Sequence, residues 1–495
     1  MDRSMLADGT DVYFPDPGTD PYGKKICDDF DVDNQLLLQR QLADKITNYA
    51  SVDEIRMLLV AGAKANVPVT RGLTPLHYAC FINYFQAAKL LLVRGAQADA
   101  VDEIGCSALH LCAEHGYYRM IKLLLQYIDA VRQYETPNYE KGQRYPIREA
   151  VEEPLRLAIK NGHYECARLL LENGATPNAI YFDGPEICNV SPLDINFIRL
   201  LLEYGADPNV YDRKGLTPIM KACRMKARGI PAIEALLEYG ADINAQAEAR
   251  ADNRTALHYA VLSGSHELVR FLITHGAQVN MPKDYTKPSV LDIAVLKDDP
   301  ELLQIVLDAG ASPNAVHTHI GTSVHLACCS LLDNQFDILR GVLDAGGEVN
   351  IQHSFDDGAT LKSPLVEYFR SRDKVDQKVF SLLTAYGGRI IMKSPLQDTR
   401  GQLRNIMRLA INNQQPEIVD QILSLAEQYD RSAIERLAIP EDLKTGILER
   451  AKSPPSLQHL SRLYLRQTFK PFNPTTVGKL GLPRELVLYL MGLSY

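Results

Sequence analysis

The sequence predicts an all-α protein that is built as a solenoid of repeated helix pairs. A phrase of the form Leu-Leu-x-x-Gly-Ala recurs along the chain of 495 residues, and most of its glycines lie 31 to 36 residues apart. A second phrase, of the form Thr-Pro-Leu-His-Tyr-Ala, precedes many of these copies at a fixed interval. The chain is 46% hydrophobic and 23% charged, which is ordinary for a folded protein and argues against disorder over most of its length.

The glycine of the first phrase marks the end of each predicted second helix. Glycine adopts the left-handed backbone conformation that ends a helix with little conformational cost. The Leu-Leu pair before it supplies the apolar face of that helix. Ile128 stands where the spacing from Gly95 places a further glycine, which indicates a degraded copy. The repeat glycines are Gly62, Gly95, Gly174, Gly205, Gly240, Gly276, Gly310, Gly346 and Gly387.

The second phrase marks the start of each predicted first helix. Its Ser or Thr side chain can accept a hydrogen bond from the free backbone N–H groups of the first turn. Pro75 and Pro218 follow that residue, and proline already has the φ angle of a first helical position. One such helix pair cannot bury its apolar face alone, so the pairs must stack on one another.

Two helices with a turn, repeated about every 33 residues, resemble the ankyrin repeat. The resemblance covers roughly residues 35–430 and implies an ankyrin repeat solenoid of about ten helix-turn-helix units with short finger loops. An insertion lengthens the spacing between Ile128 and Gly174. The unit that follows Gly174 is expected to lack most of its first helix, because Leu193 lies only eight residues before Leu201. The last unit lacks the glycine and is interpreted as an atypical cap.

The ends of the chain differ from the array in composition. The first 33 residues hold nine Asp against three basic residues and contain no apolar run that would indicate a signal peptide. This arm is either a solvated tail or a segment that packs on the array through Tyr13, Phe14 and Tyr22. The predicted domains are an acidic arm at 1–33, the array at 34–430 with an insertion at 129–152 and a capping unit at 402–430, a helical connector at 431–452, and a C-terminal module at 453–495.

The C-terminal module carries two ordered apolar series. The first has the i, i+3, i+4, i+7 spacing of one helix face and begins after Pro454-Pro455. The second contains Leu-x-Leu-Pro followed by Tyr-Leu, and Pro483 can begin its helix. The module has five basic residues against one acidic residue, whereas the net charge of the chain is −8.

This module resembles a SOCS box, and the whole chain is therefore similar to the ankyrin repeat and SOCS box proteins. The resemblance implies that the first series binds elongin C and that the second selects the cullin-5 scaffold. Two positions depart from the family pattern: Ser461 replaces a cysteine and Gly481 replaces a proline. The implied elongin-binding residues are Ser456, Leu457, Leu460, Ser461, Tyr464 and Leu465. The implied cullin-binding residues are Val477, Leu480, Leu482, Pro483, Leu486, Tyr489 and Leu490.

Two functional hypotheses follow. The resemblance implies a substrate receptor of a multisubunit ubiquitin ligase, in which the array binds a target protein and the SOCS box binds elongin B, elongin C and cullin-5 with its RING partner. The alternative is an ankyrin scaffold whose tail is an apolar helical hairpin on the array and has lost cullin recruitment. Ser461 and Gly481 keep this alternative open, and copurification of elongins B and C separates the two hypotheses.

The target is expected to bind the finger loops and the insertion, because these residues are not needed for stacking. The fingers carry charges of both signs, which favours a protein surface over a polyanion, and the insertion adds tyrosines that are common at interfaces. The alternative interpretation is that the insertion is a disordered loop. The candidate target-binding residues are Arg71, Asp102, Glu103, Tyr134, Tyr139, Tyr145, Arg213, Lys214, Arg250 and Tyr285.

The sequence predicts neither a catalytic residue nor a metal site or cofactor. The nucleotide-binding and hydrolase motifs are absent, and the histidine of the second phrase (His77, His110, His258 and His325) is expected to hydrogen-bond between units. His317 and His319 lack further ligands at metal spacing. The finger residues Asn209, Asn244 and Asn350 resemble targets of an asparaginyl hydroxylase, although a turn-forming role also explains them.

Composition also bears on partners and location. The acidic net charge argues against nucleic acid as a partner, and no apolar run is long enough to cross a bilayer. Nine scattered cysteines without Cys-x-x-Cys pairs are typical of a reducing compartment. We therefore expect a cytoplasmic protein, with the nucleus as an alternative or additional location.

Overall fold

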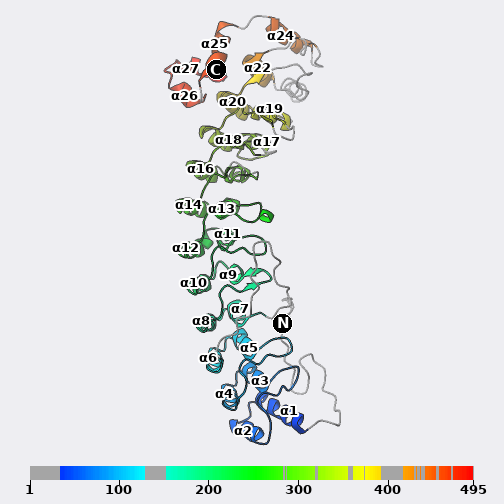
Figure 1. The fold of residues 1–495 in the computed structure, drawn as a ribbon. Helices are drawn as coiled ribbons and strands as arrows, with labels where there is room; N and C mark the ends of the chain where they lie inside the picture. The colour runs from blue at the N-terminus through cyan, green and yellow to red at the C-terminus, as the bar shows by residue number, and fades with distance from the viewer. Residues whose placement is uncertain are drawn as a thin grey trace, which may run out of the picture. The chain divides into compact units, whose positions relative to one another are not determined.

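The computed structural model is mostly helical and has the predicted ankyrin repeat solenoid fold (Figure 1). It describes residues 34–493 except 129–151, 283–284, 286, 318–320, 355–359, 373, 392–415, 429–430, 432–434, 436–440, 453–455 and 470–471. The chain divides into two compact units. The first unit comprises Met1–Ala222 and Pro231–Asp242, and the second comprises Cys223–Ile230 and Ile243–Tyr495.

The described helices of the array form ten pairs. The pairs from the start of the array to α12 are α1 (Asn34–Thr47) with α2 (Val52–Val60), α3 (Pro75–Phe81) with α4 (Phe85–Val93), α5 (Ala108–His115) with α6 (Tyr118–Leu124), α7 (Pro154–Lys160) with α8 (Tyr164–Glu172), α9 (Glu186–Asn189) with α10 (Ile195–Glu203), and α11 (Pro218–Cys223) with α12 (Ile230–Glu238). The later pairs are α13 (Ala256–Ser263) with α14 (His266–Thr274), α15 (Val290–Leu296) with α16 (Pro300–Asp308), α17 (Ser323–Cys329) with α18 (Gln335–Asp344), and α19 (Pro364–Ser371) with α20 (Gln377–Ala385).

The remaining elements are short or follow these ten pairs. Two 3-10 turns, η1 (Lys226–Gly229) and η2 (Ala249–Ala251), lie in the second unit. The C-terminal helices are α22 (Pro416–Leu425), α24 (Glu441–Lys452), α25 (Leu457–Thr468), α26 (Pro474–Gly478) and α27 (Arg484–Met491). Three two-stranded ladders join β1 (Ile180–Tyr181) to β2 (Gly184–Pro185), β3 (His353–Ser354) to β4 (Thr360–Leu361), and β5 (Ile390–Ile391) in parallel to β6 (Ala426–Gln428).

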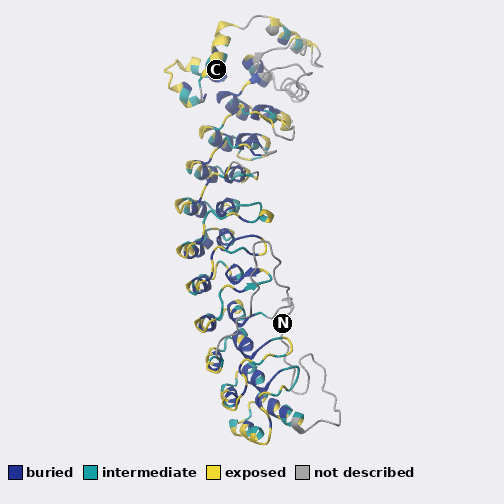
Figure 2. Cartoon of the chain, in the orientation of Figure 1, coloured by how far each residue is buried: buried dark blue, intermediate teal, exposed yellow. Residues whose placement is uncertain are grey.

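Within each of the two compact units, the first helices of successive pairs stack on one another, and so do the second helices. In the first unit, α1, α3, α5 and α7 are successive neighbours, and in the second unit α13, α15, α17 and α19 are. Figure 2 shows the buried residues between neighbouring helices and the exposed residues on the outward sides. The leucines of the first phrase form this core, and Leu91, Leu170 and Leu201 are fully buried.

The second helix pair after the insertion, α9 with α10, is shortened, as the sequence predicts for the unit that follows Gly174. Its first helix, α9, has four residues, whereas its second helix, α10, has nine. The finger before α9 is a small hairpin of β1 and β2. Glu186 at the start of α9 is buried and pairs with Arg156 of the preceding unit at 3.1 Å.

The repeat histidines have two structural roles at once. His77 Nδ1 accepts the backbone N–H of the N-cap residue Thr74, and its Nε2 lies 3.2 Å from the carbonyl oxygen of Cys106 in the next unit. The other predicted positions, His110, His258 and His325, form the same capping box with Ser107, Thr255 and Thr322. The predicted hydrogen bond between neighbouring repeats is therefore present at His77. The capping of its own helix is a second role, which the sequence did not predict.

The finger asparagines do more than form a local turn. Asn209 donates from Nδ2 to the carbonyl of Gly240 at 3.0 Å, and its Oδ1 accepts the N–H of Asp242 at 2.7 Å. Both partners belong to the next unit, so the side chain joins adjacent fingers. The same pair of bonds is made by Asn66, Asn178, Asn244, Asn280, Asn314 and Asn350. We call these seven residues the asparagine rungs.

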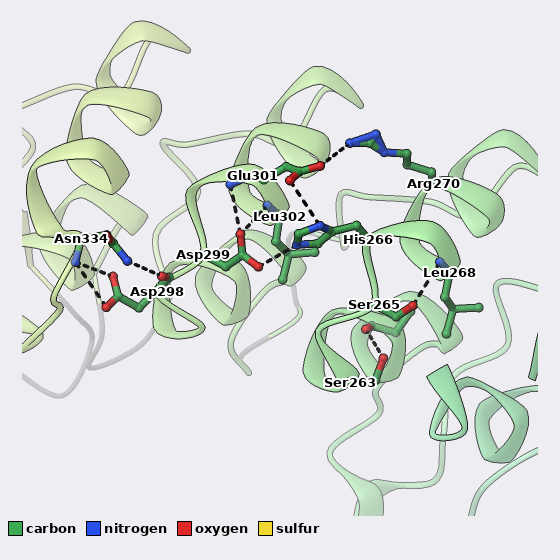
Figure 3. A network of polar contacts seen from close by, with 11 residues as sticks. Ser263, Ser265, His266, Leu268, Arg270, Asp298, Asp299, Glu301, Leu302 and Asn334 are labelled. Carbon is green, nitrogen blue, oxygen red and sulfur yellow. Dashed lines mark hydrogen bonds and ion pairs between the residues drawn. The ribbon is translucent and has the colours of Figure 1, made fainter. Parts of the chain in front are cut away.

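A polar network connects three successive helix pairs of the second unit (Figure 3). Asp299 caps α16 by accepting the N–H groups of Glu301 and Leu302, both at 3.1 Å. Its other oxygen lies 2.6 Å from His266 Nε2 at the start of α14. Asp298 accepts the N–H of Asn334, which precedes α18. These contacts fix the starts of consecutive second helices relative to one another.

Candidate partner-binding surfaces

Helix α25 presents an exposed apolar stripe on one face. Leu457, Leu460 and Tyr464 are 81%, 47% and 68% exposed, respectively, although all three are large apolar or aromatic residues. Ser456 caps the helix by accepting the N–H of His459 at 3.1 Å. Exposed apolar residues at one helical spacing form a surface that a second protein can cover.

The last residue of the first predicted series has a different environment. Leu465 is half-buried and packs against a small core formed by Phe472, Val477 and Leu490. It therefore supports the fold of the SOCS box from inside. The structure places Ser456, Leu457, Leu460, Ser461 and Tyr464 at the surface and Leu465 at the edge of the core.

The Ser461 hydroxyl has a partner within its own helix. Its Oγ donates to the carbonyl oxygen of Leu457 at 2.8 Å, which is the backbone bond that Ser makes one turn back in a helix. A partner protein that covers this position would therefore not bury an unpaired hydroxyl donor. The free-energy cost of burying Ser461 under a partner protein is therefore smaller than the cost of burying an unpaired hydroxyl.

The second predicted series divides between the interior and the surface. Val477 and Leu490 are 1% and 5% exposed and belong to the small core of the SOCS box. Tyr489 is partly covered, because the Arg462 guanidinium lies 4.5 Å from its ring centroid. The exposed members, which remain able to contact a partner, are Leu480, Leu482, Pro483 and Leu486.

Gly481 holds the turn before α27 in a conformation that proline cannot adopt. Its φ is +65°, whereas the proline ring fixes φ near −65°. A Cβ at this position would meet no heavy atom within 4 Å, so space is not what requires glycine here. The turn is thus left-handed at the point where the family pattern has proline.

The opposite face of α25 contacts the end of the array through Arg462. This side chain is only 4% exposed. It donates to the carbonyl oxygen of Ser424 in the last turn of α22 and lies 2.9 Å from His459 Nδ1. His459 Nε2 in turn lies 3.2 Å from the carbonyl oxygen of Ala426.

Arg466, one helical turn further along α25, makes a second set of contacts. It donates to the carbonyl oxygens of Thr384 at 2.7 Å and Gly388 at 3.2 Å, which lie at the end of α20. It also donates to the carbonyl oxygen of Leu490 in the last turn of α27 at 2.8 Å. Its guanidinium lies 5.1 Å from the ring centroid of Phe472.

Neither arginine was among the predicted site residues. Their i, i+4 spacing and the positive charge of the tail were the available signals. The carbonyl groups that they contact come from three separate helices, so sequence alone does not identify their partners.

The predicted target-binding residues that the structure describes come from several finger loops. Glu103 donates its backbone N–H to the carbonyl of Arg71 at 3.2 Å, so these two adjacent fingers touch. The carboxylate of Asp102 accepts the N–H groups of Ile104 and Cys106 and thereby shapes its own finger. The side chains of Glu103, Arg213, Lys214 and Arg250 are exposed.

Arg213 and Tyr285 each contact a residue of a neighbouring finger. The Arg213 guanidinium stacks 3.9 Å from the ring centroid of Phe182 in the neighbouring finger. Tyr285 is half-buried, and its hydroxyl donates to the carbonyl of Asp252 at 3.3 Å. Tyr134, Tyr139 and Tyr145 lie outside the described residues, as do the acidic arm and much of the capping unit.

The described side chains give little support to a chemical site. No group of three potential metal ligands occurs among the described residues. His317 Nε2 lies 3.2 Å from the buried carboxylate of Asp292, and His319 lies outside the described residues. Burial raises the pKa of Cys106 and of Cys188 to about 12, so these thiols stay protonated at neutral pH. Among the described helices, none combines the length and the apolar character needed to span a membrane.

Comparison with protein families identifies both parts of the chain. A family model for ankyrin repeats in three copies matches residues 46–134, 191–247 and 229–317, and a single-repeat model matches 153–181. A SOCS box model matches residues 453–491. The helix pairs α17 with α18 and α19 with α20 continue the array beyond the segment that these models match.

Individual relatives match parts of the array. Human "Ankyrin repeat and SOCS box protein 6" is 37% identical over 101 residues, which is 19% of this chain and 24% of that protein. "E3 ubiquitin-protein ligase KEG" of Arabidopsis thaliana is 26% identical over 215 residues, which is 40% of this chain and 13% of that protein. Mouse "Rabankyrin-5" is 32% identical over 174 residues, with 34% and 14% covered. The chain thus spans a quarter or less of the length of these three relatives.

Solved structures of ankyrin domains also align with the chain. The ankyrin repeat domain of Bcl-3 aligns with a TM-score of 0.38 and 22% identity over 47% of this chain and 96% of that domain. The human ASB11 ankyrin repeat domain aligns with a TM-score of 0.37 and 21% identity over 49% and 99%. The fold assignment rests on the repeats, the helix pairs and the family models.

Proposed function

Because the chain is an ankyrin repeat and SOCS box protein, we propose that it is the substrate receptor of a multisubunit ubiquitin ligase. In this proposal the array binds a target protein, and the SOCS box binds elongins B and C and a cullin-5 scaffold with its RING partner. In this role the chain acts as an adaptor and leaves the chemistry to other subunits. The adaptor brings the target close to the ubiquitin-carrying enzyme, which is catalysis by proximity.

The exposed stripe of α25 is the observation that supports this proposal most directly. Leu457, Leu460 and Tyr464 leave a large apolar area in water, whereas the Arg462 side chain of the same helix is buried against the array and Leu465 packs on the small core. Covering these three side chains would stabilise a complex by about 25 cal/mol for each Å² removed from water. A helix that served only to pack on the array would not need them.

The experiment is copurification of elongins B and C with the wild-type chain and with Leu457→Asp. The substitution places a charge at the start of the stripe, at its most exposed leucine, so elongin binding should be lost. The helix itself should persist, because Leu457 is 81% exposed and an acidic residue is favourable in the first turn of a helix.

The matched control is Leu331→Asp, which makes the same change at a leucine of the array that is 86% exposed. This variant should retain the elongins. Ser461→Cys should bind elongin as well as the wild type or better. Retention of the elongins by Leu457→Asp would refute the assignment of this stripe to elongin binding. Failure of the wild-type chain to copurify the elongins would favour the alternative of an ankyrin scaffold without cullin recruitment.

The cullin assignment requires a separate variant. Leu486 is exposed on α27 and lies outside the small SOCS-box core. Leu486→Asp should therefore retain elongins B and C and lose cullin-5 in the same copurification. Loss of both partners by this variant would argue against separate elongin and cullin surfaces.

The target is proposed to bind the fingers and the insertion. Deleting residues 132–148 should abolish capture of the native target and leave elongin binding intact. Unchanged capture by the deleted protein would leave only the fingers as candidates. The proposal includes a cytoplasmic or nuclear location, which the scattered cysteines favour.

A further inference from the structure

We propose that Arg462 and Arg466 are positioning residues that fix the angle between the SOCS box and the last ankyrin pair. They point away from the exposed stripe of α25. One face of this helix is therefore free to bind a partner, while the other is attached to the array. Neither residue belongs to the predicted elongin or cullin contacts.

The chemistry of the contacts favours a fixed geometry. The last carbonyl groups of a helix lack partners within the helix and carry the negative end of its dipole. Arg462 donates to such a carbonyl in α22, and Arg466 donates to carbonyls at the ends of α20 and α27. One guanidinium therefore joins the end of an array helix to the end of a SOCS-box helix.

Arginine suits these positions better than lysine. Its guanidinium is planar and holds five N–H donors in a rigid arrangement, so it can contact several carbonyls in defined directions. Each guanidinium also lies against an aromatic ring of the SOCS box, Arg462 against Tyr489 and Arg466 against Phe472. The aromatic ring covers one side of the guanidinium and so further restricts its orientation.

Two glycines bring the same surfaces close together. A Cβ on Gly492, at the end of α27, would lie 2.6 Å from the side chain of Leu425 in α22. A Cβ on Gly387, in the turn after α20, would lie 3.3 Å from Phe472. Gln421 Nε2 also donates to the carbonyl of Gly492 at 2.8 Å. Three residues of the array end, Gly387, Gln421 and Leu425, thus support the geometry that the two arginines define.

The consequence for the ligase rests on the proposed function. If the SOCS box carries the elongin and cullin assembly, the two arginines determine the direction in which that assembly leaves the last ankyrin pair. The attachment itself is a property of the isolated chain and can be measured without any partner.

The test measures one distance across this junction in the full-length chain. Spin labels are attached through an unnatural amino acid at Asp337 of α18 and Gln467 of α25, both of which are exposed. Double electron–electron resonance then gives the distribution of distances between them. The variants are Arg462→Lys, Arg466→Lys and the double substitution. The control is Arg484→Lys, at an exposed arginine of α27.

The wild type and Arg484→Lys should give the same narrow distribution. Each lysine variant at the junction should give a broader one, and the double variant the broadest, while the helical circular dichroism signal stays at the wild-type level. Lysine keeps the charge, so broadening would report the loss of the directed hydrogen bonds. An unchanged distribution in the double variant would overturn the proposal.

Two further outcomes are decisive. If the lysine variants broaden the distance distribution and also lose helical circular dichroism signal, the arginines stabilise the fold instead of fixing an angle. This result would also overturn the proposal. Elongin copurification should remain at the wild-type level in all three lysine variants, because the stripe is unchanged. If the wild-type chain itself fails to bind elongins, the proposed function fails, whereas the label distances still decide the attachment.

Discussion

At the scale of single residues, the repeat histidines make the stability of the array dependent on pH. Burial lowers the pKa of His110, His258 and His325 to about 4. Histidine in an unfolded chain has a pKa of about 6.5. The unfolded chain therefore binds protons that the folded chain excludes, and the stability that is present above about pH 6.5 is lost as the pH falls toward 4.

We expect the free energy of unfolding to decrease below about pH 6.5 by up to about 1.4 kcal/mol per pH unit for each of these histidines. Urea unfolding at a series of pH values measures this slope. Replacing His258 by glutamine removes one titrating group and should make the slope shallower. A stability that stays constant between about pH 7 and pH 5 would contradict the burial of neutral histidines.

Gly481 gives a second prediction at this scale. Its φ of +65° is unfavourable for any residue with a Cβ, so Gly481→Ala should cost roughly 1 kcal/mol of stability. Gly478→Ala is the matched control, because Gly478 lies in α26, lacks a positive φ, and also has open space around it. Denaturant unfolding should show a loss for the first variant only, since alanine is favourable within a helix.

At the scale of secondary structure, the start of the second helix α16 has a side-chain cap. Asp299 accepts two N–H groups at the start of α16, and its side chain also contacts His266 (Figure 3). Burial alone would raise the pKa of Asp299, but the hydrogen bonds from Leu302 and His266 outweigh it and the pKa is lowered. The cap is therefore charged at neutral pH.

Asp299→Ala should reduce the free energy of unfolding by about 1 kcal/mol, because the cap is lost. Asp299→Asn should cost much less, since asparagine caps a helix nearly as well as aspartate. Thermal or urea unfolding of the two variants measures the difference. Equal losses in both would assign the effect to the negative charge beside His266 instead of the cap.

The sequence predicted the helices of the array better than their contacts. Repeated caps, leucine pairs and glycines are local signals, so the pairs and the short α9 could be predicted from spacing. The role of Arg466 could not, because Thr384, Gly388 and Leu490 are up to 82 residues away in the chain. In the SOCS box, Leu465, Val477 and Leu490 matched the family pattern, but only the fold shows that they face inward.

At the scale of the whole second unit, the SOCS box and the end of the array share one interface. Phe472 and Arg466 cover the end of α20, and Gly492 packs on Leu425. Deleting residues 453–495 should therefore destabilise the last ankyrin pair by about 2 kcal/mol or more, because buried apolar surface and helix ends become exposed.

Calorimetry of the deleted protein beside Leu457→Asp tests this prediction. The deleted protein should melt at a lower temperature, whereas the point variant should melt as the wild type does. A deleted protein with an unchanged melting temperature would show that the SOCS box is an independent appendage. If deletion lowers the melting temperature as expected, Leu457→Asp is the better variant for capturing targets without elongins.

The asparagine rungs also bear on the chemical ageing of the protein. Asparagine deamidates when the backbone nitrogen of the next residue attacks the side-chain amide, a reaction that is fastest when that residue is glycine. Every rung is followed by a residue with a side chain, and these residues are Val67, Ala179, Val210, Ala245, Met281, Ala315 and Ile351. The hydrogen bonds to the next unit further hold each amide in place. Conversion of a rung to aspartate would replace an N–H donor by a carboxylate facing a carbonyl oxygen, so slow deamidation at these seven positions preserves the connections between fingers over the lifetime of the molecule.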